Sequence, residues 1–116
     1  MRRSIREREV RFEVIDDRLV QTVVGPEGRG YAHRCDRQTY ERVAHAIEEA
    51  GQAGVTLEPL ARAIHAPYTQ VNVALGFLKE RGCLVTRLRR HYPASTFLFK
   101  DAMIEYLALA EGKPAD

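Results

Sequence analysis

The stretch of sequence that decides the fold is QVNVALGFLKERGCLVTRLRRHYPASTFLFK, residues 70–100. In its first part, apolar residues recur at the spacing of one helix face, namely Val71, Ala74, Leu75 and Leu78. We therefore expect a helix over about residues 67–81, which Gly82 ends because glycine tolerates the left-handed backbone of a helix C-terminus. Beyond the glycine, LVTRL and TFLF are two strand-like runs. This change of period predicts a β-hairpin over residues 83–100, with its turn at residues 93–95.

Two more helices are expected before this stretch and one after it. Asp36 is a suitable N-cap for a helix that runs to about Ala50 and is ended by Gly51. Thr56 is a suitable N-cap for a shorter helix that contains LEPLARAI. After the hairpin, Asp101 is expected to cap a last amphipathic helix. Helical spacing predicts the residues that face the core: Tyr40, Val43, Ala44 and Ile47, then Leu57, Leu60, Ala61 and Ile64, and finally Met103, Ile104, Leu107 and Ala108.

Residues 1–35 are predicted to be a charged segment followed by a β-hairpin. The first strand alternates between apolar residues and charged ones, with Val10, Phe12 and Val14 on one face. A polar cluster separates it from a second apolar run at residues 19–24, which GPEGRG ends. Because an isolated two-stranded ribbon is marginal in water, this hairpin must dock on the domain or on a partner. Residues 111–116 are expected to be a disordered tail.

Composition limits the class of protein. The chain has 116 residues, of which 45% are hydrophobic and 29% charged, as suits one globular domain. No run approaches the roughly 18 apolar residues of a membrane helix, and charged residues stand where a signal peptide would be apolar. Cys35 and Cys83 lie far apart, so we expect neither a disulfide scaffold nor a zinc finger. These features predict a cytoplasmic protein with no membrane association.

A short helix, a tight turn, a second helix and a hairpin form a unit that can place its second helix in the major groove of DNA. Within it, the segment QVNVALGFLKERGCL opens on an uncharged polar residue and a valine, repeats leucine at Leu75 and Leu78, and ends on a charged pair and a glycine. This segment resembles the recognition helix of bacterial winged helix-turn-helix regulators. The resemblance extends back through LEPLARAI and forward through RLRRHYPASTFLF, over about residues 36–110.

The resemblance implies an α+β fold of the winged helix-turn-helix type. Such a fold has a three-helix core, a β-hairpin wing and a C-terminal helix, here with an N-terminal β-hairpin extension. It also implies that the chain is a DNA-binding protein, a small transcriptional regulator that uses a recognition helix at about residues 67–81 and a basic wing at residues 83–100. Since regulators of this type commonly act as dimers, we expect a homodimer formed through the N-terminal hairpin, the last helix or both.

The distribution of charge favours DNA binding more than the total does. The formal net charge is only +2, yet no acidic residue lies between Glu80 and Asp101. That segment holds five basic residues, Arg81, Arg87, Arg89, Arg90 and Lys100. On a wing, its arginines would lie along phosphates, with His91 and Tyr92 at the tip adding hydrogen bonds. The alternative is a solvated hairpin in a protein rich in arginine.

The predicted recognition helix is less basic than its family usually is, since Val73 stands where such repressors commonly have a basic residue. Gln70 or Asn72 could make a bidentate contact to adenine, and Val73 could pack on a thymine methyl. Tyr68 and Thr69 could hold phosphates. The alternative is that Gln70 and Asn72 are ordinary exposed polar residues. The candidate DNA-binding residues are thus Tyr68, Thr69, Gln70, Asn72, Val73, Lys79, Arg87, Arg89, Arg90 and His91.

A different function rests on Phe77. Either it closes over the base of the wing as part of the core, or it forms an exposed apolar patch with Val73 and Gly76. An exposed patch would favour a winged-helix module for protein–protein interaction, with the arginines serving an acidic partner.

Catalysis and bound cofactors find no support in the sequence. It holds no GxSxG, GxxxxGK[ST] or HExxH motif, and its four histidines stand far apart. His33 and Cys35 could share a metal with Cys83 only if the fold brought them together. We therefore expect no enzyme activity, no metal, no cofactor and no small-molecule ligand.

Overall fold

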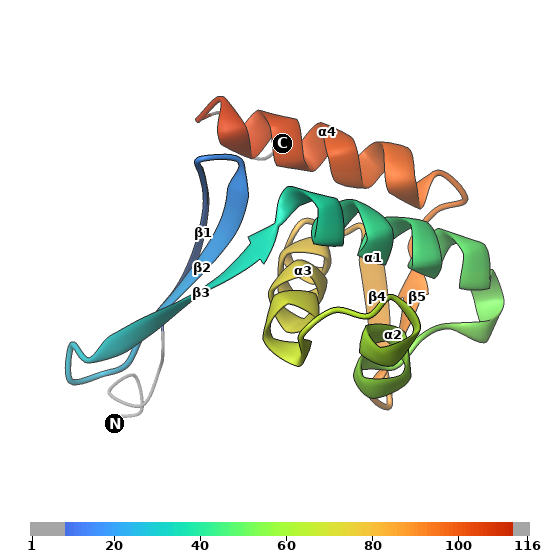
Figure 1. Ribbon diagram of the computed structural model, residues 1–116, viewed down its shortest axis with the longest axis horizontal. Helices are drawn as coiled ribbons and strands as arrows, with labels where there is room; N and C mark the ends of the chain where they lie inside the picture. The colour runs from blue at the N-terminus through green and yellow to red at the C-terminus, as the bar shows by residue number, and fades with distance from the viewer. Residues whose placement is uncertain (1–8, 113–116) are drawn as a thin grey trace, which may run out of the picture.

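The computed structural model describes residues 9–112 as an α+β protein with four α-helices and two small antiparallel sheets (Figure 1). The predicted charged segment before residue 9 and the end of the predicted tail after residue 112 lie outside the described residues. The elements in chain order are β1 (Glu9–Ile15), β2 (Arg18–Val24), β3 (Gly30–Asp36), α1 (Arg37–Ala50), the 3₁₀ turn η2 (Gly51–Ala53), α2 (Leu57–Ala63), α3 (Tyr68–Glu80), β4 (Leu84–Arg87), β5 (Arg90–Pro93) and α4 (Leu98–Ala110). No helix within residues 9–112 has the length and apolarity that crossing a membrane requires.

The predicted core faces of the first three helices are confirmed. The residues at 2% exposure or less include Tyr40, Val43, Ala44, Ile47, Ala61, Val71, Ala74 and Leu78. Gly51 and Gly82 end α1 and α3 as expected, and both have a positive φ. Asp36 and Thr56 stand at the N-cap positions, but neither side chain makes a capping hydrogen bond.

The N-terminal sheet has a third strand that the sequence analysis did not predict. The antiparallel order is β1-β2-β3, and β3 pairs with the whole of β2 before running directly into α1. GPEGRG is therefore a turn between two strands rather than the end of a sheet. Gly30 follows that turn, where any side chain would collide with the carbonyl oxygen of Val23. The sequence did not predict β3 because six of its seven residues are exposed, so it lacks the alternation of buried apolar and exposed polar residues that indicates a strand.

The second sheet is shorter than predicted. Its two strands, β4 and β5, turn at Leu88 and Arg89, whereas the expected turn at residues 93–95 begins on the last residue of β5. TFLF is not a strand, since α4 begins at Leu98. A short apolar run fits either period, and here packing against α1 decides, because Leu98 is the first of three fully buried residues spaced four apart. The other two are Ala102 and Tyr106.

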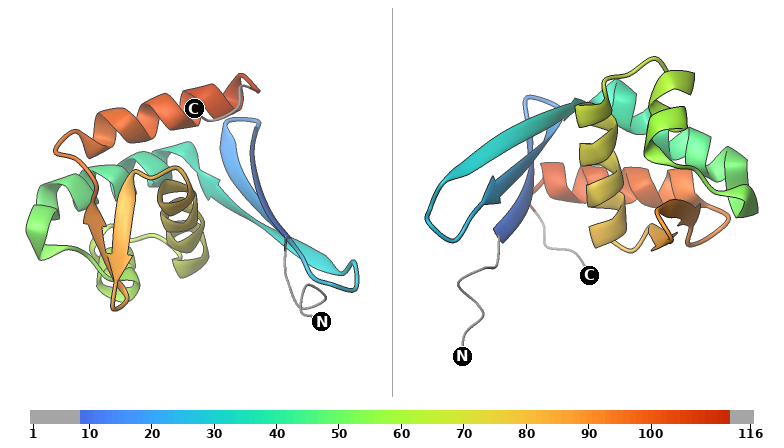
Figure 2. Two further views of the ribbon diagram at one scale, coloured as in Figure 1. Left: turned by 180° about the vertical axis from the view of Figure 1, so that it is seen from behind. Right: turned by 90° about the horizontal axis from the view of Figure 1, so that it is seen from below.

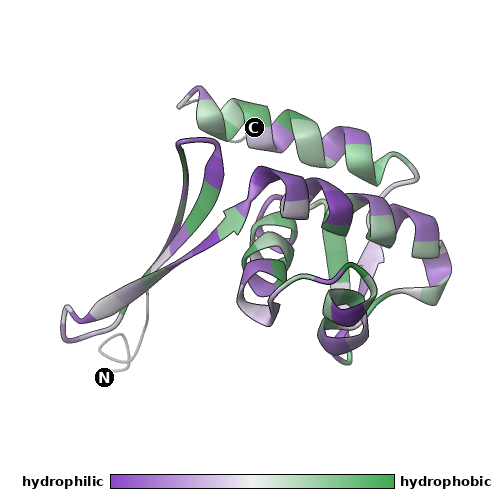
Figure 3. Ribbon diagram, viewed as in Figure 1, coloured by the Kyte–Doolittle hydropathy of each residue, from purple (hydrophilic) through white to green (hydrophobic). Residues whose placement is uncertain are grey.

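The inward face of α4 also differs from the prediction. Ile104 is 53% and Leu107 44% exposed, while Met103 is half-buried. Asp101 lies in the first turn and accepts a hydrogen bond from Ser95 Oγ at 2.8 Å instead of capping the helix. The helix starts four residues earlier than expected, and the stripe that meets α1 consists of Leu98, Ala102 and Tyr106 instead of the predicted residues. Figure 3 shows hydrophobic residues over much of α4, which leaves some of them outside the core.

A single backbone bridge ties the β4–β5 hairpin to the segment before α2. The Val55 N–H donates to the His91 carbonyl at 2.9 Å, and the His91 N–H donates to the Val55 carbonyl at 2.8 Å. The hairpin is thus anchored at its second strand to the connection between α1 and α2.

The expectation that the N-terminal strands must dock is confirmed, and they dock on the chain's own α3. The Phe12 ring of β1 lies 5.4 Å from the Phe77 ring of α3, centroid to centroid. The amide N–H of Asp36, at the end of β3, donates to Gln70 Oε1 at 3.0 Å. The far end of the sheet, with the β2–β3 turn, extends away from the helices as a twisted ribbon (Figure 1).

Candidate nucleic-acid interface

Three elements point toward one side of the molecule. The β4–β5 turn, α2 and the N-terminal end of α3 all lie at the lower side in Figure 1, opposite α4. Seen from below, in the right panel of Figure 2, α3 lies between the N-terminal sheet and the β4–β5 hairpin. A ligand that approaches from this side meets helix, hairpin and sheet together.

The exposed surface of α3 is a narrow stripe. Thr69, Asn72 and Lys79 are exposed along it, and Tyr68 is 45% exposed at the start of the helix. Gln70 is half-buried, with its side-chain oxygen held by the amide N–H of Asp36. The stripe offers hydroxyl, amide and ammonium groups, all of which form hydrogen bonds with nucleic acid.

The prediction for Val73 is wrong, because its side chain is only 1% exposed. Phe77 is fully buried, and a Cβ on Gly76 would lie 3.4 Å from Gln21 Nε2 and 3.5 Å from Phe12 Cζ. The prediction of an exposed apolar patch of Val73, Gly76 and Phe77 is therefore wrong. The alternative, that Phe77 belongs to the core, is confirmed. The N-terminal sheet, which was predicted to be a hairpin extension outside the winged-helix domain, covers this face of α3.

The three arginines of the hairpin have different surroundings. The Arg87 guanidinium stacks over the Tyr92 ring, 4.8 Å from its centroid, and Arg90 donates to the carbonyl of Ala53 at 3.1 Å. Arg89 has no hydrogen-bond or ion-pair partner within the described part of the chain. All three remain exposed, and Arg89 lies in the turn itself.

His91 and Tyr92 are not at the tip, contrary to the prediction. Both are half-buried within β5, behind the turn, and His91 Nδ1 lies 2.8 Å from Thr86 Oγ1. Burial, with a smaller contribution from the charge of Lys79, lowers the pKa of His91. The imidazole is therefore neutral at physiological pH and adds no positive charge to the surface.

Fewer basic residues of the segment after Glu80 reach the candidate interface than the sequence indicates. Arg81 forms an ion pair with Glu105 at 2.7 Å, with side-chain exposures of 10% and 25%, and lies over the Phe77 ring. Lys100 belongs to α4, on the opposite side of the molecule (Figure 1). Of the five basic residues in this segment, only the three hairpin arginines are left for the candidate interface.

The sheet contributes polar groups that the sequence analysis missed. A hollow of about 340 Å³ lies between the sheet and the start of α3, with Gln21, Tyr31 and His33 on one wall and Tyr68, Thr69 and Asn72 on the other. The Tyr31 and His33 rings lie 4.8 Å apart. The available signal was the period-two spacing of Tyr31, His33 and Cys35 after a glycine, which was too short and too polar to predict a strand.

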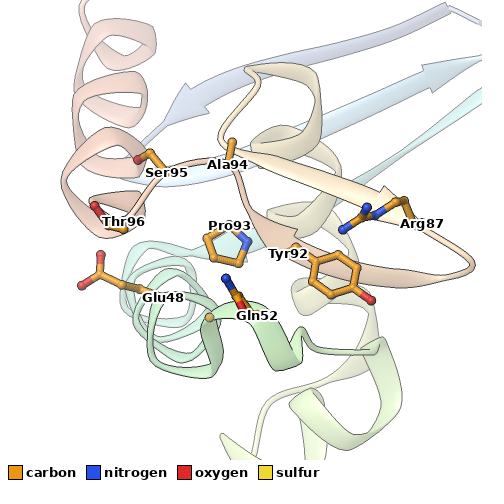
Figure 4. A pocket seen from close by; sticks show the side chains of 9 residues that line it. Glu48, Gln52, Arg87, Tyr92, Pro93, Ala94, Ser95 and Thr96 are labelled. Atoms are coloured by element: carbon orange, nitrogen blue, oxygen red, sulfur yellow. The ribbon is translucent and has the colours of Figure 1, made fainter.

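A larger hollow, of about 670 Å³, separates the end of α1 from the base of the hairpin (Figure 4). Glu48 and Gln52 face Tyr92, Ser95 and Thr96 across it. Glu48 Oε1 already accepts the amide N–H of Phe99 at 2.8 Å, so this carboxylate helps to start α4. The hollow adjoins the stacked pair of Arg87 and Tyr92.

The two cysteines are buried and unbonded. Burial raises the pKa of Cys35 to about 12 and that of Cys83 to about 11, so both thiols are protonated at neutral pH. Within residues 9–112, no group of three or more His, Cys, Asp or Glu side chains is placed to hold a metal ion.

Comparison of the chain with protein-family models, with curated proteins and with solved structures finds no match.

Proposed function

We propose that the chain is a winged helix-turn-helix DNA-binding protein that acts as a small transcriptional regulator. Three features of the architecture support this proposal. Helices α1, α2 and α3 precede a β-hairpin, the β4–β5 hairpin is bridged to the segment before α2 at Val55, and α3 keeps an exposed polar stripe. In this proposal α3 is the recognition helix and the β4–β5 hairpin is the wing.

The observation that carries the proposal is that the N-terminal end of α3 and the β4–β5 turn, which holds Arg89, lie on one side of the molecule (Figures 1 and 2). Asn72 is the side chain that fits a bidentate contact to an adenine edge. Thr69 and Tyr68 bond phosphates at the start of the helix, and Arg89 reaches the backbone from the wing. Sequence is then read by few groups, while most of the affinity comes from phosphate contacts.

The N-terminal sheet limits how α3 sits on DNA. It covers the side of the helix that holds Val73 and Phe77, so the helix enters the groove by its N-terminal half. Glu80, at the C-terminal end of the stripe, is then kept away from the phosphates. Tyr31 and His33 of β3 lie beside Thr69 and Asn72, where they face the flanking backbone.

A salt titration tests the proposal. Binding of the full chain to a mixed-sequence duplex of about 25 bp is measured as the salt concentration rises, for the parent, Arg89→Ala and Lys100→Ala. We expect steep weakening with salt, and a slope of log K against log salt that falls by about one for Arg89→Ala only. Lys100→Ala is the matched control, because it removes one exposed charge from the opposite side. Absence of binding at low salt, or equal slopes for the two variants, would count against the function.

The proposed regulator works in the cytoplasm as a homodimer. The outer face of α4 supports this choice of interface, since Ile104 and Leu107 are exposed one turn apart. α4 lies opposite the wing tip, so two copies joined through it keep both DNA-facing sides free (Figure 1).

A further inference from the structure

Leu88 is the most exposed large apolar side chain in the described part of the chain. Its exposure is 99%, and the next value, for Phe97, is 66%. Leu88 stands at the tip of the β4–β5 hairpin, between Arg87 and Arg89. Exposing an apolar side chain to water is unfavourable, and a polar residue at this tip would avoid that free-energy cost. Folding alone therefore gives no reason for a leucine here.

The backbone at the tip is unfavourable for the residues that occupy it. Leu88 has φ +51° and Arg89 has φ +69°, as a two-residue hairpin turn with both central residues left-handed requires. The β1–β2 turn has the same conformation at Asp16 and Asp17, φ +52° and +58°, where short polar side chains tolerate it. Leucine is thus held in a strained position at one turn of a protein whose other turn uses residues suited to it.

Contacts of the residues next to the turn hold this tip in place. His91 is bridged to Val55 through two backbone hydrogen bonds and its ring is bonded to Thr86. Arg87 stacks on Tyr92, and Arg90 is bonded to the carbonyl of Ala53. Arg87 and Arg90 are directly opposite in the strand register, which places like charges side by side just behind the tip. The hairpin thus presents an exposed apolar side chain next to three exposed arginines.

We propose that Leu88 is a wedge that enters the minor groove of DNA and partly unstacks a base step, so that the bound duplex bends. This proposal rests on the proposed DNA binding and specifies how the wing meets the duplex. The minor groove is narrow and is bordered by the phosphates of both strands. Apolar side chains flanked by basic ones enter it and kink flexible base steps such as TA and CA. In this arrangement Arg89 contacts the phosphates at the edge of the groove, while Leu88 contacts the bases at its bottom.

An anionic membrane surface is the other partner that an apolar residue among arginines could meet. Stable membrane binding needs a large apolar face, whereas Leu88 stands alone at its tip. The neighbouring surface at the start of α3 is polar, with Thr69 and Asn72 exposed. The tip and its neighbours together therefore match a duplex better than a lipid surface.

The first test uses the absence of tryptophan from the chain. Leu88→Trp places a single fluorophore at the tip, and Phe97→Trp, at another exposed apolar position just before α4, is the matched control. On saturation with a mixed-sequence duplex, followed by the anisotropy of labelled DNA, we expect quenched emission and protection from iodide for Leu88→Trp only. A bound complex in which both tryptophans behave alike would overturn the proposal. A blue shift with phosphatidylglycerol vesicles, together with no change on DNA, would overturn it in favour of a membrane.

The second test separates the wedge from the charges. Leu88→Asn suits the left-handed turn and keeps the net charge, so the hairpin still folds. With a duplex labelled at both ends for energy transfer, we expect the parent to shorten the end-to-end distance and Leu88→Asn to lose this bend. The salt slope stays unchanged in Leu88→Asn but falls by about one in Arg89→Ala. Equal bending by parent and Leu88→Asn overturns the wedge while leaving DNA binding intact, and no binding by the parent overturns the proposed function itself.

Discussion

Gly76 lies in the middle of α3, where the N-terminal sheet comes closest to the helix. A Cβ at this position would make ordinary contacts, at 3.4 Å to Gln21 and 3.5 Å to Phe12. Gly76→Ala should therefore raise the free energy of unfolding by about 0.5–1 kcal/mol, because alanine favours a helix more than glycine does. Gly76→Leu should lower it, since the longer side chain displaces the sheet. Urea denaturation measures both.

Gly54 is the matched control for this prediction. It has φ +72°, and a Cβ there would lie 2.7 Å from Arg90 Cγ and 2.8 Å from Tyr92 Cε2. Gly54→Ala should destabilise the protein, because both the backbone conformation and the space are unsuitable. A stabilising Gly54→Ala, or a destabilising Gly76→Ala, would contradict the packing described for the two glycines.

His91 links stability to pH. Because burial lowers the pKa of His91 in the folded state, the unfolded chain binds a proton more readily in the range between the two pKa values. The free energy of unfolding should then fall as the pH drops below about 6.5, the ordinary histidine value. Thermal unfolding of the parent and of His91→Gln from about pH 7.5 to about pH 5.5 measures this. The variant should lose less stability on acidification, and identical pH dependence in the two proteins would contradict the prediction.

At the level of elements, local periodicity predicts the three helices before the wing and misses β3 and the start of α4. In α1 and α3, apolar residues repeat along several turns, so one helix face is specified by the chain itself. β3 has one buried residue, Cys35, and depends on pairing with β2. TFLF is too short to show a period of its own, and α4 begins within it, at Leu98, because this residue packs against α1.

The ion pair of Arg81 and Glu105 joins α3 to α4. The two groups lie 2.7 Å apart and are largely shielded from water. Removal of the Glu105 carboxylate therefore leaves the largely buried Arg81 guanidinium without its ion-pair partner. Glu105→Ala should lower the free energy of unfolding by about 2 kcal/mol, less than for a fully buried pair. The matched control, Glu58→Ala, removes the exposed pair with Arg62 at 3.4 Å and should cost about 0.5 kcal/mol or less. Equal costs in urea denaturation would contradict the role of the Arg81 pair.

At the level of the whole molecule, the N-terminal sheet is part of the core. Leu19 and Cys35 are fully buried together with residues of the helices. The sheet closes one face of α3 and lines the hollow next to Asn72. It thereby decides which residues of the candidate recognition helix remain exposed.

The proposed homodimer is a prediction at the same scale. Sedimentation equilibrium of the full chain at high micromolar concentration should give twice the monomer mass of 13.2 kDa. Ile104→Lys should shift it to the monomer, because it places charge on the exposed apolar face of α4. Val10→Lys, at a similarly exposed position on β1, is the control and should leave the dimer intact. A monomer mass for the parent would contradict the dimer, and loss of the dimer in Val10→Lys would move the interface to the sheet.

By itself, the sequence determined the inward faces of α1, α2 and α3, the glycines that end two of these helices, and the concentration of arginine next to one hairpin. Each of these follows from local periodicity, backbone preference or charge, which neighbouring residues carry without help from the rest of the chain. Only the tertiary structure decided that Val73 and Phe77 are covered, that Arg81 is neutralised by Glu105, and that Leu88 stands alone at the tip. These outcomes depend on contacts between segments far apart in the sequence, and a residue's own neighbours do not reveal which distant surface will pack against it.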